Sequence, residues 1–168
     1  LKRLLRLVQI ASNPWLVDES YAGIPGKFPV LLDMISHITR NEEKAIIWSS
    51  FTSNVDWLAQ KLSEFGSVKV HGKIAIADRN RGIERFLTDE KRQVLIATPG
   101  AAKEGLTLTA ANHVIFYDRS FSLDDYLQAQ DRIHRISQTH KCFVTNLLME
   151  DSIDEWVDIL LKAKELAA

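Results

Sequence analysis

The sequence predicts an α/β fold in which a mostly parallel sheet is flanked by helices on both faces. The first observation is a set of short runs that are apolar at nearly every position, among them 93–97 and 113–117, and strands buried on both faces have this pattern. The second is that amphipathic stretches separate these runs, which is typical of parallel strands joined by helices. No internal repeat or low-complexity tract interrupts the alternation.

The individual elements follow from the same patterns. Leucines at helical spacing predict a first helix that Asn13-Pro14 ends, and the Gly- and Pro-containing segment 18–29 is expected to be a loop. Apolar runs predict strands at 44–49, 67–70, 93–97, 113–117 and 142–148. Helical periodicity predicts helices at 30–39, 123–135 and 152–164. Two more helices are expected to begin at a capping residue: one runs from a cap at Thr52 or Ser53 to residue 62, and the other from a cap at Asp78 to residue 87.

The composition is that of an ordinary globular domain. The 168 residues are 46% hydrophobic and 26% charged, which allows one sizeable core. The net charge of −1 gives no overall basic field, so any nucleic-acid contact has to come from local clusters. The single cysteine, Cys142, suits a reducing compartment and is expected in a buried strand. No apolar run is long enough to span a membrane, and the start at Leu1 suggests a piece of a longer protein.

The strongest functional signal lies in residues 126–138. On the predicted helix Arg132 and Arg135 are three residues apart and Gln128 lies about one turn earlier, so the three side chains share a face. Two guanidinium groups beside an amide suit the negative charge of a phosphate chain. For an isolated arginine pair, however, a solvated helix face is the simpler interpretation.

The segment from Tyr126 to Gln138 resembles motif VI of the SWI/SNF-like family of superfamily-two helicases. Other parts resemble the same family: 45–53 is similar to motif IV, 94–112 to motif V, and 7–16 and 71–86 to further family stretches. The resemblance covers nearly the whole chain. It implies a RecA-like three-layer domain, with 1–26 as an N-terminal helix and linker and 27–168 as the C-terminal RecA-like helicase domain.

The resemblance implies that the chain is one lobe of a DNA-dependent ATPase that translocates along duplex DNA and remodels bound proteins. Arg132 and Arg135 are then the catalytic arginine fingers, and Gly105 and Gln128 join them at the nucleotide. The candidates for contact with the DNA backbone, without sequence preference, are Ser49, Ser50, Thr52, His71, Thr98 and Lys103. ATP and Mg²⁺ would be held mainly by an N-terminal RecA-like lobe, which is the second expected partner.

Several of these residues also have simpler explanations. The hydroxyl groups near Thr52 suit a helix cap as well as a phosphate, and a loop histidine such as His71 more often makes a local hydrogen bond. The apolar stripe of 152–164 is expected to pack on the sheet, with a partner-binding helix as the alternative. The five histidines lack zinc-like spacing, so a metal site is not expected in this chain.

The sequence contains no phosphate-binding loop of the Walker type. Gly26-Lys27-Phe28 lacks the hydroxyl residue needed at magnesium and does not follow an apolar strand. The isolated chain is therefore expected to be inactive as an ATPase. Two other functions stay open: a lobe of a strand-separating or restriction-system helicase, and a catalytically silent protein-docking module. The expected location is inside the cell, away from membranes: a prokaryotic or virus-infected cytoplasm, or a eukaryotic nucleus.

Overall fold

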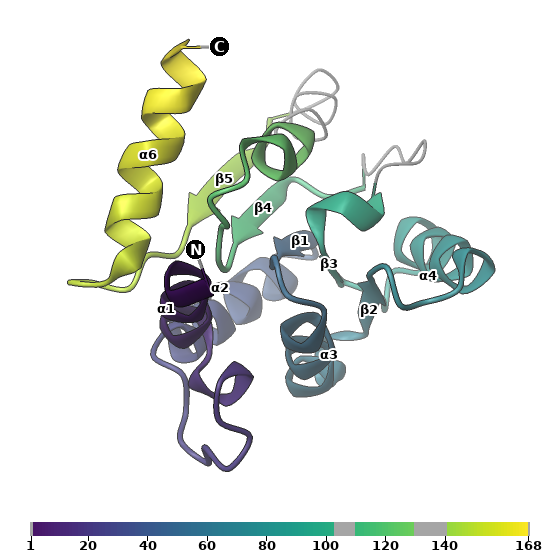
Figure 1. Ribbon diagram of the computed structural model, residues 1–168. Coiled ribbons are helices and arrows are strands. Elements are labelled where there is room, and N and C mark those ends of the chain that lie inside the picture. The colour runs from purple at the N-terminus through teal and green to yellow at the C-terminus, as the bar shows by residue number, and fades with distance from the viewer. Residues whose placement is uncertain (1, 103–109, 130–140, 168) are drawn as a thin grey trace.

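The computed structural model describes residues 2–102, 110–129 and 141–167 (Figure 1). Within these residues five strands form one sheet in the order β2-β3-β1-β4-β5, and every neighbouring pair is parallel. The strands are β1 (Ala45–Trp48), β2 (Ser67–Val70), β3 (Val94–Ala97), β4 (His113–Phe116) and β5 (Phe143–Asn146). The predicted α/β fold with a parallel sheet is confirmed.

Helices connect the strands. The α-helices are α1 (Lys2–Ser12), α2 (Lys27–Arg40), α3 (Thr52–Lys61), α4 (Ile76–Thr88) and α6 (Ile153–Ala167), and residues 123–129 are also helical. Short 3-10 helices lie at Pro14–Leu16, Ser63–Phe65 and Pro99–Ala102.

The sheet is the middle layer of three. Successive residues of a strand point to opposite faces, and here both faces are covered. Ile46 and Trp48 belong to the cluster that packs under α4, together with Ala129 of the 123–129 helix. Ile47 belongs to the opposite cluster, which receives the apolar sides of α2 and α3. The flanking helices on both faces are therefore as the sequence predicts.

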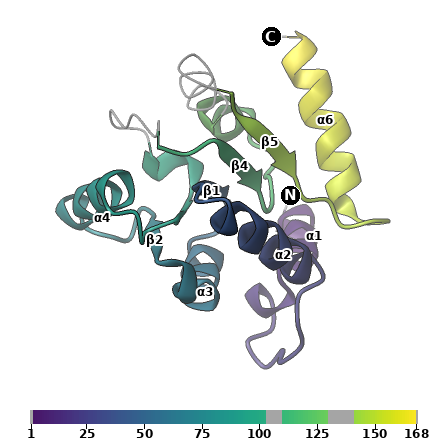
Figure 2. The ribbon, with the colours of Figure 1, turned by 180° about the vertical axis from the view of Figure 1, so that it is seen from behind.

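Helix α6 lies beyond the β5 end of the sheet, whereas α4 lies near its β2 end, as both ribbon views show (Figures 1 and 2). Val157 and Leu161 of α6 are buried against Val8 of α1. The prediction that the last helix packs on the sheet through its whole apolar stripe is wrong, because its buried apolar residues, Val157 and Leu161, pack with Val8 of α1 and Trp156 remains 70% exposed. The division of the chain at residue 26 stays a prediction.

Helices α2, α3 and α4 begin in another way than predicted. Helix α2 begins at Lys27, before Pro29, because proline is tolerated in a first turn where its missing N–H is not needed. Helix α4 begins at Ile76 with Ala75 at the N-cap, so Asp78 is not the cap and its carboxylate pairs with Arg81 instead.

Helix α3 begins at Thr52 with Phe51 at the N-cap, and no side chain caps it. The alternative in which Thr52 or Ser53 caps this helix is therefore wrong.

Cys142 is half-buried and directly precedes β5, so the prediction of a buried strand position is wrong. The cause is that β5 is an edge strand, three of whose four residues are exposed. Partial burial still raises the pKa of the Cys142 thiol.

Candidate functional site

The loops that follow β1, β3 and β4 meet at one edge of the sheet, because parallel strands direct their carboxyl ends to the same side. They share a small pocket with the start of the 123–129 helix. Its lining comes from Ser50 after β1, Pro99 after β3, Phe116, Asp118, Arg119, Ser120 and Ser122 at and after the end of β4, and Asp125 and Tyr126 of the helix. We call the loops 49–51, 98–102 and 117–122 the working edge.

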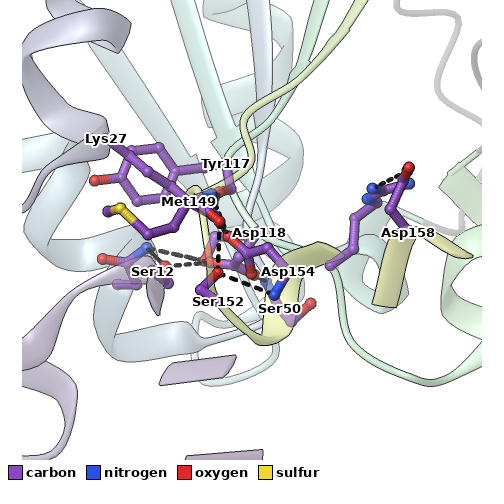
Figure 3. A network of polar contacts seen from close by, with 12 residues as sticks. Ser12, Lys27, Ser50, Tyr117, Asp118, Met149, Ser152, Asp154 and Asp158 are labelled. Atoms are coloured by element: carbon purple, nitrogen blue, oxygen red, sulfur yellow. Dashed lines mark hydrogen bonds and ion pairs between the residues drawn. The ribbon is translucent and has the colours of Figure 1, made fainter. Parts of the chain in front are cut away.

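Asp118 is the centre of a buried hydrogen-bond network at the working edge (Figure 3). Its Oδ2 accepts hydrogen bonds from Ser12 Oγ at 2.7 Å and from Ser49 Oγ at 2.6 Å, and its Oδ1 accepts from the Ser50 backbone N–H at 2.7 Å. Asn54 Nδ2 donates to Ser49 Oγ at 3.1 Å. Bonds to an ionised acceptor are the strong ones, so one carboxylate fixes α1, the loop after β1 and the start of α3 together.

The hydroxyl groups predicted to contact DNA differ in accessibility because of this hydrogen-bond network. Ser49 is fully buried and donates to Asp118, so its side chain positions the loop and does not reach a phosphate in this arrangement. Ser50 lines the pocket with a half-buried side chain, and Thr52 is half-buried at the first position of α3. Of the three hydroxyl groups predicted to contact DNA in this region, Ser50 and Thr52 are therefore the accessible ones.

His71, in the loop after β2, makes two local hydrogen bonds, which is the alternative that the sequence left open. Its Nδ1 accepts from the Lys73 backbone N–H at 3.2 Å, so its Nε2 is the donor to Asp56 Oδ1 at 2.8 Å. Lys69 Nζ lies 2.9 Å from the same carboxylate oxygen. Burial raises the pKa of Asp56, but the bonds from His71 and Lys69 outweigh it and hold this pKa below its ordinary value.

Thr98 directly follows β3 and belongs to the working edge. Its backbone N–H donates to the Val70 carbonyl at 3.1 Å, while its side chain is half-buried. The predicted residues Lys103, Gly105, Arg132 and Arg135 lie outside the described residues.

Gln128 is placed on the helical segment 123–129, which Ala129 anchors in the core. The side-chain Oε1 of Gln128 is buried, and it has no hydrogen-bond partner among the described residues. A buried acceptor without a donor is unfavourable by about 1–3 kcal/mol. This amide is therefore a polar group that a further donor would stabilise.

Arg119 connects the working edge to α6. Its Nη2 lies 2.6 Å from Asp158 Oδ1, and its guanidinium carbon lies 5.9 Å from the centroid of the Tyr126 ring. Lys162 Nζ lies 2.9 Å from the other oxygen of Asp158. Burial raises the pKa of Asp158, but Arg119 and Lys162 outweigh it and hold this pKa below its ordinary value.

Lys27 is buried and joins three elements at the end of β4 (Figure 3). Its Nζ lies 2.7 Å from Asp154 Oδ2 and donates to the Tyr117 carbonyl at 2.7 Å. The same oxygen of Asp154 accepts from the Met149 backbone N–H at 2.9 Å. The lysine after Gly26 is thus a structural group that ties α2, β4 and α6 together.

Sequence reasoning missed Asp118, Arg119, Asn54 and the Lys27–Asp154 pair. A carboxylate directly after the apolar run 113–117 is a signal that could have identified Asp118, since the carboxyl ends of parallel strands gather polar groups. No local signal identifies the Lys27–Asp154 pair, because its members are separated by nearly the whole domain.

In the described ranges no group of three or more His, Cys, Asp or Glu side chains could hold a metal ion. Of the described helices, none combines the length and the apolar character that a membrane crossing requires.

Comparison with known proteins extends these observations. The family model described as the helicase conserved C-terminal domain matches residues 26–137. ATP-dependent helicase FUN30 of Saccharomyces cerevisiae is 34% identical over 93% of this chain, and the lymphoid-specific helicase of Homo sapiens is 32% identical over 83% of it. The chain spans 13% and 17% of the lengths of these two relatives.

Two solved structures are similar in fold and sequence. The C-terminal part of the Fun30 ATPase domain has a TM-score of 0.74 and 30% identity, over 94% of this chain and 53% of that one. The Sulfolobus solfataricus SWI2/SNF2 ATPase core in complex with dsDNA has a TM-score of 0.82 and 26% identity, over 99% of this chain and 36% of that one.

Proposed function

The chain belongs to the helicase conserved C-terminal domain family, in its SWI2/SNF2-type branch, and from this we propose that it is the second RecA-like lobe of a DNA-dependent ATPase. In this function it supplies arginine fingers and DNA-backbone contacts to an ATP site that an N-terminal RecA-like lobe mainly holds. The whole protein uses ATP to translocate along duplex DNA and to remodel proteins bound to it, inside the cell and, in a eukaryote, in the nucleus.

The observation that carries the proposal is the convergence of three loops and one helix at the working edge. Ser50, Pro99 and Asp118 from the three loops line one pocket with Asp125 and Tyr126 of the 123–129 helix. Two of these loops, 49–51 and 98–102, belong to the segments similar to motifs IV and V, and the helix contains the first residues of the segment similar to motif VI. Because the segments proposed to contact DNA and the segment proposed to contact the nucleotide line the same pocket, a movement caused by one ligand can reach the binding site of the other.

On the nucleotide side, the proposed residues are Gly105, Gln128, Arg132 and Arg135. The buried Oε1 of Gln128, which lacks a partner among the described residues, supports a role for this amide in a closed arrangement of two lobes. A phosphoryl group in transfer carries negative charge on its oxygens, and guanidinium groups stabilise that charge. We assign Mg²⁺ and most of the ATP contacts to the other lobe, since this sequence has no Walker-type loop.

On the DNA side, the proposed contacts are Ser50, Thr52, Thr98 and Lys103. Hydroxyl and ammonium groups that bind phosphates position a protein on DNA without reading its sequence. In this proposal Ser49 and His71 do not contact DNA themselves, and each holds a loop in position. Ser49 holds the loop of Ser50 by its bond to Asp118, and His71 holds the loop after β2.

The test measures DNA binding by fluorescence anisotropy on two duplexes of unrelated sequence, over a series of salt concentrations. We expect similar affinities for both duplexes and a steep decrease with salt, because bound counterions are released. Lys103→Ala should weaken binding equally for both duplexes. The matched control is Lys91→Ala, an exposed lysine in the loop before β3, at the opposite edge of the sheet, which should change little.

Binding that depends strongly on DNA sequence, or that is insensitive to salt, would contradict the proposed DNA surface. The purified 168-residue chain should also lack DNA-stimulated ATP hydrolysis, because the phosphate cradle and magnesium ligands are assigned to the other lobe. Turnover by this chain alone would contradict the two-lobe proposal.

A further inference from the structure

A groove lies between the end of α1 and the start of α6, away from the working edge. Its lining comes from Leu7, Ile10 and Ala11 of α1, from the loop 149–152, and from Ile153, Glu155 and Trp156 of α6. The groove is open to solvent and has a volume of ≈ 830 Å³.

The groove exposes large apolar side chains that the fold itself does not use. Trp156 is 70% exposed, Leu7 47% and Ile10 46%. Val8, Val157 and Leu161 already make the buried contact between the two helices. Large exposed apolar patches often mark sites of interaction with other proteins. Tryptophan is enriched among the interface residues that contribute most of the binding energy.

The apolar residues continue beyond the groove in two helical rows. Leu4 and Leu7 are three residues apart on α1, and Trp156 and Leu160 are four apart on α6, so each pair lies on one side of its helix. Leu4 is 40% exposed and Leu160 38% exposed. Two neighbouring rows of this kind offer a seat for a third helix, whose apolar side chains would fill the space between them.

The charge at the groove is of one sign. Its charged lining residues are Glu150, Asp151 and Glu155, and no basic residue of the described part of the chain lines it. Glu155 in the first turn of α6 also suits the helix dipole, and its side chain accepts from the Asp151 backbone N–H. Glu150 and Asp151 precede the helix and are exposed. These carboxylates favour lysine and arginine on an occupant.

We propose that this groove binds an amphipathic helix of a protein partner, one with an apolar face and with Lys or Arg on the flank that meets Glu150 and Asp151. The apolar face packs on Leu7, Ile10 and Trp156. The proposal does not rest on the ATPase function, because no residue of the working edge lines the groove.

The test uses the 168-residue chain and a fluorescein-labelled peptide of about 14 residues, roughly four helical turns, with leucines on one face and lysines beside them. A twin peptide carries glutamate in place of every lysine. We expect saturable binding of the lysine peptide by anisotropy, and binding at least about tenfold weaker for the glutamate twin, because of the carboxylates at the groove.

Variants locate the site. Trp156→Ser should weaken lysine-peptide binding about tenfold or more, whereas Ile159→Ser, a matched control on α6 with 63% exposure outside the groove lining, should leave it unchanged. Glu150→Lys should weaken the lysine peptide and strengthen the glutamate twin. Circular-dichroism melting checks that each variant remains folded.

Three results would overturn the proposal. The first is no saturable binding of the lysine peptide, and the second is equal binding of the two peptides. The third is a dimer of the chain in sedimentation velocity that Trp156→Ser abolishes, which would show that a second copy occupies the groove.

Discussion

At the scale of single residues, Asp118 holds several elements together at the working edge. Its partners Ser12, Ser49 and Asn54 come from α1, the loop after β1 and α3, so the carboxylate determines how these elements meet. The sequence could not show this, because these partners are far apart along the chain and each is individually an ordinary polar residue. Only the fold brings them within hydrogen-bond distance.

Asp118→Asn should lower the free energy of unfolding by about 2–3 kcal/mol, because an amide NH₂ group would face hydrogen-bond donors in a buried site. Urea unfolding at pH 7 measures the change. Asp124→Asn is the matched control on an exposed aspartate six residues later and should stay within about 0.5 kcal/mol of the wild type. Equal effects of the two variants would show that the network contributes little.

Asp158 provides a test that depends on pH. The folded-state pKa of this carboxyl is below its ordinary value of 3.8, so its ion pairs stabilise the fold fully above that value and lose this contribution as pH falls through the folded-state pKa. Asp158→Asn should therefore destabilise the chain at pH 7 by about 1–2 kcal/mol.

The difference between Asp158→Asn and the wild type should shrink as the pH is lowered below the ordinary value of 3.8. Urea unfolding at several pH values measures it. A difference that is constant over this range would mean that the charge of Asp158 does not stabilise the fold.

At the scale of secondary-structure elements, the sequence predicted all five strands of the described sheet, because runs such as Val94–Ala97 are apolar at each position and fully buried. Helix starts were less predictable. For α4, a conspicuous capping residue, Asp78, directed the prediction to the wrong position, and the helix begins without a side-chain cap. Where packing determines the start of a helix, capping chemistry alone does not locate it.

The position of α6 could not be predicted from its apolar stripe. Periodicity shows that a helix has an apolar side but not which element that side meets. In the structure Val157 and Leu161 meet α1, and the Lys27–Asp154 pair fixes the start of α6 against α2 and β4. Substitutions at this buried pair therefore test how much the contact of α6 with α2 and β4 contributes to the stability of the fold.

Lys27→Met should lower the free energy of unfolding by about 3–5 kcal/mol, because it leaves the Asp154 carboxylate buried without its cation. Asp154→Asn in the Lys27→Met background should recover part of the loss, since the remaining charge is then removed. A double-mutant cycle by urea unfolding measures the coupling. Lys73→Met, at an exposed lysine, is the control, and additive effects of Lys27→Met and Asp154→Asn would contradict a direct pair.

At the scale of the whole molecule, the three-layer arrangement places polar loops at one edge of a parallel sheet and an apolar groove at a separate place between α1 and α6. That the loops after β1, β3 and β4 gather at one edge follows from the parallel direction of these strands. The sequence could not predict the groove, because the groove exists only where two helices from opposite ends of the chain meet. The sequence signal at 126–138 remains the basis for the role of the arginines.

The central claim is that this lobe completes an ATP site through Arg132 and Arg135, and DNA-stimulated ATP turnover by the two-lobed protein tests it most directly. Arg132→Ala and Arg135→Ala should each reduce turnover on the order of 10³-fold or more, with little change in ATP affinity, because the interaction forms mainly in the transition state. Arg85→Ala, at an exposed arginine of α4, should leave turnover unchanged. Near-normal turnover by both finger variants would contradict the claim.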